Sequence, residues 1–155
     1  KSEKYRWFMT PYLIITDEMT HALCLAAKRG VDVRIITPGM PDKKLIYSIT
    51  RSFYHGLVKN GVRIYEWTPG FCHAKMSVAD DCMATCGTIN LDYRSLYHHF
   101  ENGCFMADSQ TVLDIRDDLG ATMNECREVT EKYRTGRSAY LRLGQLFMRL
   151  FAGLL

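Results

Sequence analysis

A histidine and a lysine stand two positions apart in the segment FCHAKMSVAD, where they are His73 and Lys75. The small and apolar residues around them predict a strand over 73–79, and residues two apart in a strand point to the same face. We therefore expect both side chains to face one way, with Asp80 at the strand end, where the chain turns. The tight turn GTIN, over 87–90, adds backbone donors, a hydroxyl and an amide.

An imidazole, an ammonium and an amide at one rim of a sheet can hold and attack a phosphate ester. Cleavage of a phosphodiester without metal needs positively charged donors on the non-bridging oxygens. It also needs a nucleophile that is active near neutral pH, which histidine supplies. A covalent phosphohistidine divides one difficult displacement into two easier ones, and a second histidine can protonate the leaving alkoxide. This chemistry requires neither a metal ion nor an organic cofactor.

The spacing H-x-K-x4-D followed by G-T-x-N is similar to the signature of the phospholipase D superfamily. The surrounding segments resemble the C-terminal half of bacterial cardiolipin synthases over nearly the whole chain. These segments are TPYL at 10–13, RGVDVR at 29–34, GVRIY at 61–65, GTINLDYRSL at 87–96 and FEN at 100–102. The resemblance implies an α/β fold of the phospholipase D type, a three-layer α-β-α sandwich with a mixed, largely parallel sheet.

The resemblance also implies roles for the residues that match the motif. His73 would be the nucleophile or the general acid of this half, and Lys75 would hold phosphate oxygens. Asp80 would be the motif aspartate, which completes the catalytic set by orienting the site rather than by reacting.

Three further residues would support the catalytic set. Asn90 would bind phosphate oxygens together with the lysine. Glu101 occupies the place of a family carboxylate that hydrogen-bonds the motif histidine, which would fix its tautomer and stabilise its charged form. Thr88 stands where serine is commoner in the family and keeps the hydroxyl. The roles of Asp92, Arg94, His98 and His99 stay open.

Family lipid synthases carry two such motifs, which meet at a pseudo-twofold axis and contribute one histidine each. This sequence holds one motif and opens with Lys1 instead of Met. We therefore expect a fragment of a longer protein whose N-terminal half supplies the second motif, so that the fragment alone is nearly inactive. A homodimer of two single-motif chains is the alternative.

The activity that the resemblance implies is phosphatidyl transfer between two phosphatidylglycerol molecules, giving cardiolipin and glycerol. It would take place at the cytoplasmic side of the bacterial cell membrane. Three alternatives stay open: another phospholipid transferase or hydrolase of the superfamily, a homodimeric nucleic-acid phosphodiesterase, and a non-catalytic binding module. A net charge of +3 and the lack of clustered Lys and Arg near the motif argue against a nucleic-acid partner.

Composition and periodicity predict the elements that position these residues. A chain of 155 residues with 47% hydrophobic content is typical of one globular domain, and no uncharged apolar run approaches the roughly 18 residues of a membrane span. We expect a domain over 1–137 and an amphipathic helix over 138–155, which docks on the domain or on lipid. The predicted strands are 5–9, 31–36, 62–67, 73–79, 82–86 and 100–106, and the predicted helices are 16–30, 41–61, 109–133 and 139–155.

The six cysteines are expected to be reduced, packed thiols. A zinc site from Cys72, His73, Cys82 and Cys86 is disfavoured, because the sequence contains no C-x-x-C pair. Two tyrosines, Tyr12 and Tyr54, are predicted to be core aromatics with a solvent-exposed hydroxyl rather than ligand contacts.

Overall fold

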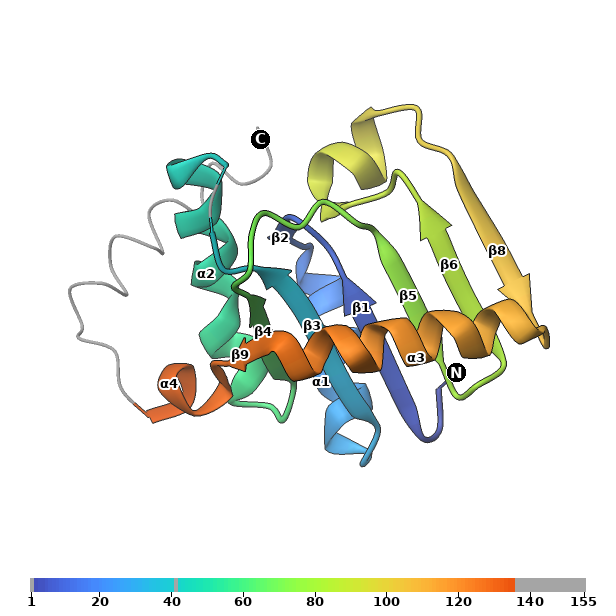
Figure 1. Ribbon diagram of the computed structural model, residues 1–155. Coiled ribbons are helices and arrows are strands. Elements are labelled where there is room, and N and C mark those ends of the chain that lie inside the picture. Colours follow the sequence, from blue (N-terminus) through green and yellow to red (C-terminus); the bar gives the residue numbers. More distant parts are fainter. Residues whose placement is uncertain (1, 41, 136–155) are drawn as a thin grey trace.

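A mixed sheet lies at the centre of the computed structural model, which describes residues 2–40 and 42–135 (Figure 1). Its strand order is β8-β6-β5-β1-β3-β4-β9, and a second small sheet pairs β2 with β7. The strands are β1 (Tyr5–Met9), β2 (Leu13–Ile14), β3 (Asp32–Pro38), β4 (Arg63–Trp67), β5 (Met76–Ala79), β6 (Met83–Gly87), β7 (Leu91–Asp92), β8 (Gly103–Ala107) and β9 (Cys126–Glu128).

Helices cover both faces of this sheet and make the three layers that the family resemblance implies. They are α1 (Asp17–Lys28), α2 (Lys44–Val58), α3 (Gln110–Glu125), α4 (Thr130–Thr135) and a short π-helix, η1 (Arg94–His98). In Figure 1, α3 crosses in front of the sheet and α1 lies behind it. The α/β class and the sandwich architecture are therefore confirmed.

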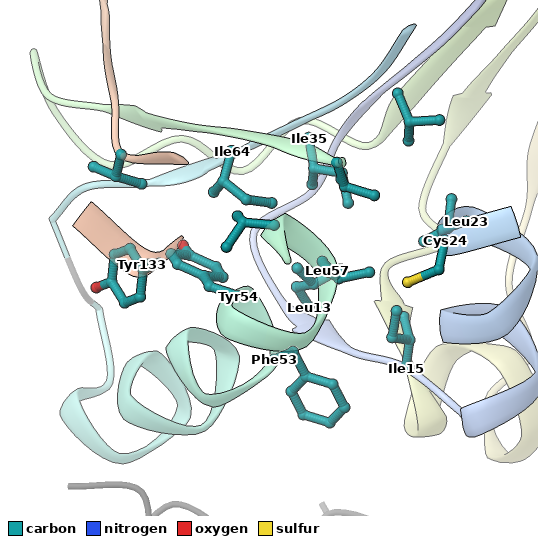
Figure 2. Close-up of a cluster of buried hydrophobic side chains, with 14 of the residues drawn as sticks. Leu13, Ile15, Leu23, Cys24, Ile35, Phe53, Tyr54, Leu57, Ile64 and Tyr133 are labelled. Atoms are coloured by element: carbon teal, nitrogen blue, oxygen red, sulfur yellow. The ribbon is translucent and has the colours of Figure 1, made fainter. Parts of the chain in front are cut away.

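Alternation along β3 shows how one strand serves two cores. Ile35 faces the cluster beneath α1 and α2, which Figure 2 shows with Leu57 and Tyr54 of α2. Its neighbour Ile36 faces the other cluster, where Leu119 of α3 packs. Successive side chains of a strand point to opposite faces, so the apolar run in β3 fits a strand buried on both sides.

The local signals in the first half act as the sequence predicts. Thr16 caps α1, where its Oγ1 accepts a hydrogen bond of 3.1 Å from the backbone nitrogen of Met19. Gly30 and Gly61 follow α1 and α2 with φ of 91° and 98°, a left-handed conformation that glycine adopts without steric cost. After these two helix ends the chain enters β3 and β4, and β3 pairs in parallel with both β1 and β4.

The expectation of a largely parallel sheet is corrected in its proportions. Within the large sheet of the described residues, only the β1–β3 and β3–β4 pairs are parallel. The remaining neighbours in the large sheet pair antiparallel: β5 and β6 form a hairpin, β8 returns along β6 after β7 and η1, β5 runs against β1, and β9 runs against β4. Parallel pairing is thus confined to the centre of the sheet.

The single helix predicted over 109–133 is wrong. The chain leaves the helix after α3, adds β9 to the edge of the sheet and then forms α4. Met123 of α3 packs in the cluster on one face of the sheet, whereas Val129 and Tyr133 pack in the cluster on the other. A continuous helix cannot reach both faces, so the chain must pass around the sheet edge.

Two other boundaries also shift. The strand predicted over 73–79 begins at Met76, and the strand predicted over 100–106 becomes Gly103–Ala107. No helix in the described part of the chain is long and apolar enough to cross a bilayer. The amphipathic helix predicted over 139–155, and with it the 138–155 part of the domain division, lies outside the described residues.

All six cysteines are free thiols. The prediction that they are packed is wrong for Cys86 and Cys104, which are exposed and stand opposite each other on β6 and β8. Cys82 directly precedes β6 and Cys86 lies near the end of that strand, roughly 13 Å away for an extended chain, which separates two members of the zinc set considered above.

We expect N-ethylmaleimide to modify Cys86 and Cys104 at least about tenfold faster than Cys24 and Cys126 at neutral pH. Burial raises the pKa of the Cys126 thiol to about 12 and also raises the pKa of Cys24, so both hold little reactive thiolate. Peptide mass spectrometry at timed quenches measures the four rates. Equal rates at exposed and buried positions would contradict this assignment of burial.

Candidate active site

The side chains of His73 and Lys75 meet, although neither residue lies in a strand. Both belong to the loop that joins β4 to β5. The Lys75 Nζ lies 2.9 Å from the Nδ1 of His73 and 3.2 Å from its Nε2, and it donates to the His73 carbonyl oxygen at 2.6 Å. The imidazole and the ammonium therefore share one small volume, as a phosphate site requires.

Two aromatic rings flank the imidazole of His73. The ring centroid of Phe71 lies 5.8 Å away in a tilted arrangement, and that of Tyr12 lies 6.4 Å away and faces the imidazole edge-on. The Tyr12 hydroxyl donates to Asp42 at 2.6 Å, and burial together with this contact raises the pKa of Tyr12 to about 12. Tyr12 thus lies beside the site and contacts its central ring, which the sequence interpretation did not foresee. Tyr54 is a core aromatic, as predicted, but its expected contact with solvent is wrong, because it is fully buried and its hydroxyl lies 2.6 Å from the Oγ1 of Thr37.

The GTIN turn lies directly beside Lys75. The Gly87 nitrogen donates to the Lys75 carbonyl oxygen at 3.2 Å, and a Cβ on Gly87 would stand 2.3 Å from the Asn102 carbonyl oxygen. Only glycine therefore permits this close approach of two backbones. Thr88 donates a hydrogen bond from its hydroxyl to Glu101 and accepts one of 2.9 Å from the Asn102 nitrogen.

Electrostatics link Lys75 to two carboxylates of the neighbouring segments. Burial lowers the pKa of the Lys75 ammonium, and the negative charges of Glu101 and Asp92 partly offset this effect. The carboxamide oxygen of Asn90, as placed, is buried without a hydrogen-bond partner among the described residues. The turn that begins at Gly87, beside the Lys75 backbone, therefore carries an amide oxygen without a partner in the described part of the chain.

Glu101 occupies a different place from the one that the family resemblance implies. Its carboxylate accepts a hydrogen bond from the Thr88 hydroxyl, and hydrogen bonds from the hydroxyls of Thr88 and Ser95 hold the pKa of Glu101 below its usual value. The imidazole within ion-pair distance is that of His99, whose Nδ1 lies 3.9 Å from the carboxylate. No described contact joins Glu101 to His73, so the predicted histidine partner is corrected to the threonine of the turn.

Asp80 lies at the opposite end of β5 from the histidine loop. Its carboxylate accepts hydrogen bonds from the backbone nitrogens of Glu3, Lys4 and Tyr5, at 2.7, 2.9 and 2.8 Å. Partial burial opposes its ionisation, but the three donors outweigh burial and lower the pKa of Asp80. The motif aspartate therefore anchors the start of β1 and is not grouped with the catalytic pair.

Two side chains that sequence analysis left open join the rim of the site. The Arg94 Nε donates to the Nε2 of His99 at 2.8 Å, which brings the guanidinium to the imidazole beside Glu101. Asp92 accepts from the backbone nitrogen of Ser95 at 2.7 Å and caps η1. The spacing of the sequence could not reveal this arrangement, because it depends on a single turn of π-helix.

Metal ligation finds no cluster of candidates in this region. Within residues 2–40 and 42–135, no group of three or more His, Cys, Asp or Glu side chains gathers closely enough to hold an ion. The side-chain donor in contact with His73 is the ammonium of Lys75, which binds anions rather than cations.

The chain matches the family model described as "Cardiolipin synthase, PLD-like domain" over residues 1–123. It is 34% identical to cardiolipin synthase 2 of Bacillus cereus over 99% of its own length and 30% of that protein. It is 35% identical to a cardiolipin synthase of Clostridium perfringens, covering 99% of this chain and 32% of that protein. The chain therefore spans about a third of the length of these curated relatives.

Solved structures share its fold. The phospholipase D family member Nuc of Salmonella typhimurium superposes with a TM-score of 0.71 at 17% identity, over 83% of each chain. Phosphatidylserine synthase of Haemophilus influenzae gives a TM-score of 0.70 at 16% identity, over 99% of this chain and 40% of that chain. Together with the family match, these similarities show that the chain belongs to the cardiolipin synthase PLD-like domains of the phospholipase D superfamily.

Proposed function

We propose that the protein containing this chain transfers a phosphatidyl group from one phosphatidylglycerol to another, producing cardiolipin and glycerol. The observation that carries the proposal is the contact between His73 and Lys75 beside the GTIN turn, in a chain of the cardiolipin synthase PLD-like family. The catalytic set is His73 and Lys75, with Asn90, Thr88 and Glu101 in support. Asp80 stabilises the fold at the start of β1 and takes no part in the reaction.

In the first step, an imidazole nitrogen bonds to the phosphorus of the donor lipid, and the bond from phosphorus to the oxygen of the glycerol headgroup breaks. That oxygen takes a proton from a second acid and leaves as glycerol. In the second step, a hydroxyl of the acceptor phosphatidylglycerol gives its proton back to that acid, now in its basic form, and the hydroxyl oxygen bonds to the phosphorus. The bond from phosphorus to the imidazole nitrogen breaks, which frees the histidine. Lys75 stabilises the charge on the phosphate oxygens in both steps. His73 is one of the two groups, the nucleophile or the acid.

The second histidine comes, in this proposal, from a second motif in the N-terminal half of the protein. A surface next to the site suits such a partner domain. A cavity of about 240 Å³ is lined by Lys75, Phe8 and Met19, and a second cavity of about 410 Å³ shares Phe8 and Met19 with it. Beyond it, Phe105 on β8 is 67% exposed. An apolar sheet face beside a half-built site supports docking of the second domain there.

A pair of identical chains is the second candidate arrangement, and one observation favours it. The Salmonella protein Nuc is covered by this chain over 83% of its length, so a similar fold exists in a protein of similar size.

If the pseudo-twofold partner is supplied by the N-terminal half, the isolated 155-residue chain will show less than about 1% of the transfer activity of the intact protein. Sedimentation together with a phospholipid assay measures this, and an active monomer would contradict it.

The proposed place of action is the cytoplasmic side of the bacterial cell membrane, where both lipid substrates reside. Attachment would come from the N-terminal part of the protein and from the amphipathic segment 138–155. Nucleic acid is not proposed as a partner, because a net charge of +3 gives weak attraction to a phosphate backbone.

The direct test supplies the intact protein with vesicles of phosphatidylglycerol and follows both products. Cardiolipin and glycerol should appear in equal amounts without added metal. Formation of phosphatidic acid alone would favour a hydrolase of the same superfamily. Cleavage of oligonucleotides without turnover of lipid would favour the nucleic-acid phosphodiesterase, and binding without turnover would favour a non-catalytic module.

A further inference from the structure

We propose that Arg94, oriented by His99, forms a second phosphate-binding site, which holds the phosphate of the acceptor lipid while the donor phosphate reacts at His73 and Lys75. The inference rests on the proposed function. It assigns Arg94 to the choice of acceptor: a phospholipid alcohol rather than water or a small neutral alcohol.

Arg94 is held on a short, well-anchored element. It is the first residue of η1, which follows β7 directly, and β7 pairs in parallel with β2. Thr10 Oγ1 accepts from the backbone nitrogen of Leu91 at 3.1 Å, and Asp92 caps η1 through Ser95. The backbone that carries Arg94 is therefore fixed at both its strand and its cap.

A chain of contacts connects the guanidinium to the GTIN turn. Arg94 Nε donates to Nε2 of His99, which leaves the hydrogen of the neutral ring on Nδ1, the nitrogen 3.9 Å from Glu101. Glu101 in turn accepts from Thr88. Two side chains, those of His99 and Glu101, thus separate Arg94 from the turn beside Lys75.

The charge of Arg94 is not neutralised within the described part of the chain. No described carboxylate forms an ion pair with it, and His99 engages the Nε alone, so the two terminal nitrogens remain available. The nearby carboxylate, Glu101, is already occupied by a hydroxyl. A guanidinium with two free nitrogens matches the oxygens of a phosphate in a bidentate arrangement.

The reaction itself calls for such a group. Cardiolipin contains two phosphates joined by one glycerol, so the acceptor brings a second phosphate to within one glycerol of the reacting phosphorus. Water and small alcohols bring none. A cation beside the site therefore improves binding of the lipid acceptor in particular, whereas Lys75 acts on the donor phosphate in every transfer.

The test uses the full-length protein, phosphatidylglycerol vesicles and ethanol as a neutral competing acceptor. Arg94→Gln should lower the ratio of cardiolipin to phosphatidylethanol by about tenfold to a hundredfold, the usual weight of a charge-assisted contact. Formation of phosphatidylethanol should stay within about threefold of the unmodified protein. His99→Gln, which removes the acceptor that orients Arg94, should lower the ratio by a smaller factor.

Arg134→Gln is the matched control, because Arg134 is an exposed arginine of α4 that pairs with Glu131. Its product ratio should be unchanged. An unchanged ratio in Arg94→Gln, or an equal loss of both products, would overturn the inference. If that variant does not fold, Arg94→Lys decides by the same ratio, since it keeps the charge but loses the bidentate geometry. Absence of both products with the unmodified protein would instead reject the proposed function.

Discussion

Replacing His73 by alanine in the intact protein should lower phosphatidyl transfer by about 10²–10⁴-fold, the usual contribution of a nucleophile or a proton-transfer group. The imidazole is exposed, and the ammonium of Lys75 lies within 3.2 Å of both its nitrogens. Because an ammonium has no free lone pair, Lys75 does not replace the imidazole when His73 is removed. The initial rate of cardiolipin formation on phosphatidylglycerol vesicles measures the loss. Near-normal turnover would end the catalytic assignment.

His21→Ala provides the control for this experiment. His21 is exposed on α1 and lines a different cavity, together with Cys24 and Asn60, from the one that opens at Lys75. Both variants remove an exposed imidazole, and thermal unfolding should show little change in stability for either. A fall in activity for His73→Ala alone then reports on the reaction rather than on folding.

The chemistry of the site could be predicted further than its geometry. The sequence indicates that His73 and Lys75 act together, and their side chains do meet. The predicted reason was a shared strand face, but β5 begins after Lys75, and both residues lie in a loop. The lysine reaches the imidazole by folding back onto its own loop, where it also binds the His73 carbonyl oxygen. Strand periodicity says nothing about such a contact.

The elements of the first half could be predicted because their signals are local. The cap at Thr16 and the glycines after α1 and α2 determine boundaries without reference to the rest of the chain. The end of α3 depends instead on distant packing, since Tyr133 fills the core beside Tyr54 on the far face of the sheet. The helical pattern of the sequence continues past Glu125, where α3 ends, and therefore does not indicate that boundary.

The rim of the site shows the same limit. Arg94, His99 and Glu101 come together because η1 is capped by Asp92 and because Thr88 takes the carboxylate. Arg94 and His99 are five residues apart and Thr88 and Glu101 are thirteen apart, and neither spacing matches a regular α-helix or strand period. The family resemblance identified the segment, and the structure was needed to show which atoms meet.

Asp80→Asn should lower the free energy of unfolding by about 2 kcal/mol and leave turnover per folded molecule within about threefold. Its charged carboxylate receives three backbone hydrogen bonds that hold the start of β1, and charge-assisted bonds are worth roughly 1.5–3 kcal/mol each when lost outright. Asparagine keeps part of this network and tolerates the φ of 53° found here. Denaturant titration and the transfer assay measure the two quantities.

The acid dependence of stability distinguishes this role from a catalytic one. Because the pKa of Asp80 is lowered in the folded protein, its contribution is fully present above the unfolded carboxyl pKa of about 4 and is lost as the pH falls through the folded value. The stability difference between the native protein and Asp80→Asn should therefore be constant from about pH 5 to 8 and shrink below about pH 4.

Asp81→Asn is the matched control, because Asp81 is next in the chain, has a φ of 61° and makes a surface contact to Arg116. This substitution should lower the free energy of unfolding by less than about 1 kcal/mol. A variant Asp80→Asn that is as stable as the native protein but inactive would return the aspartate to the reaction.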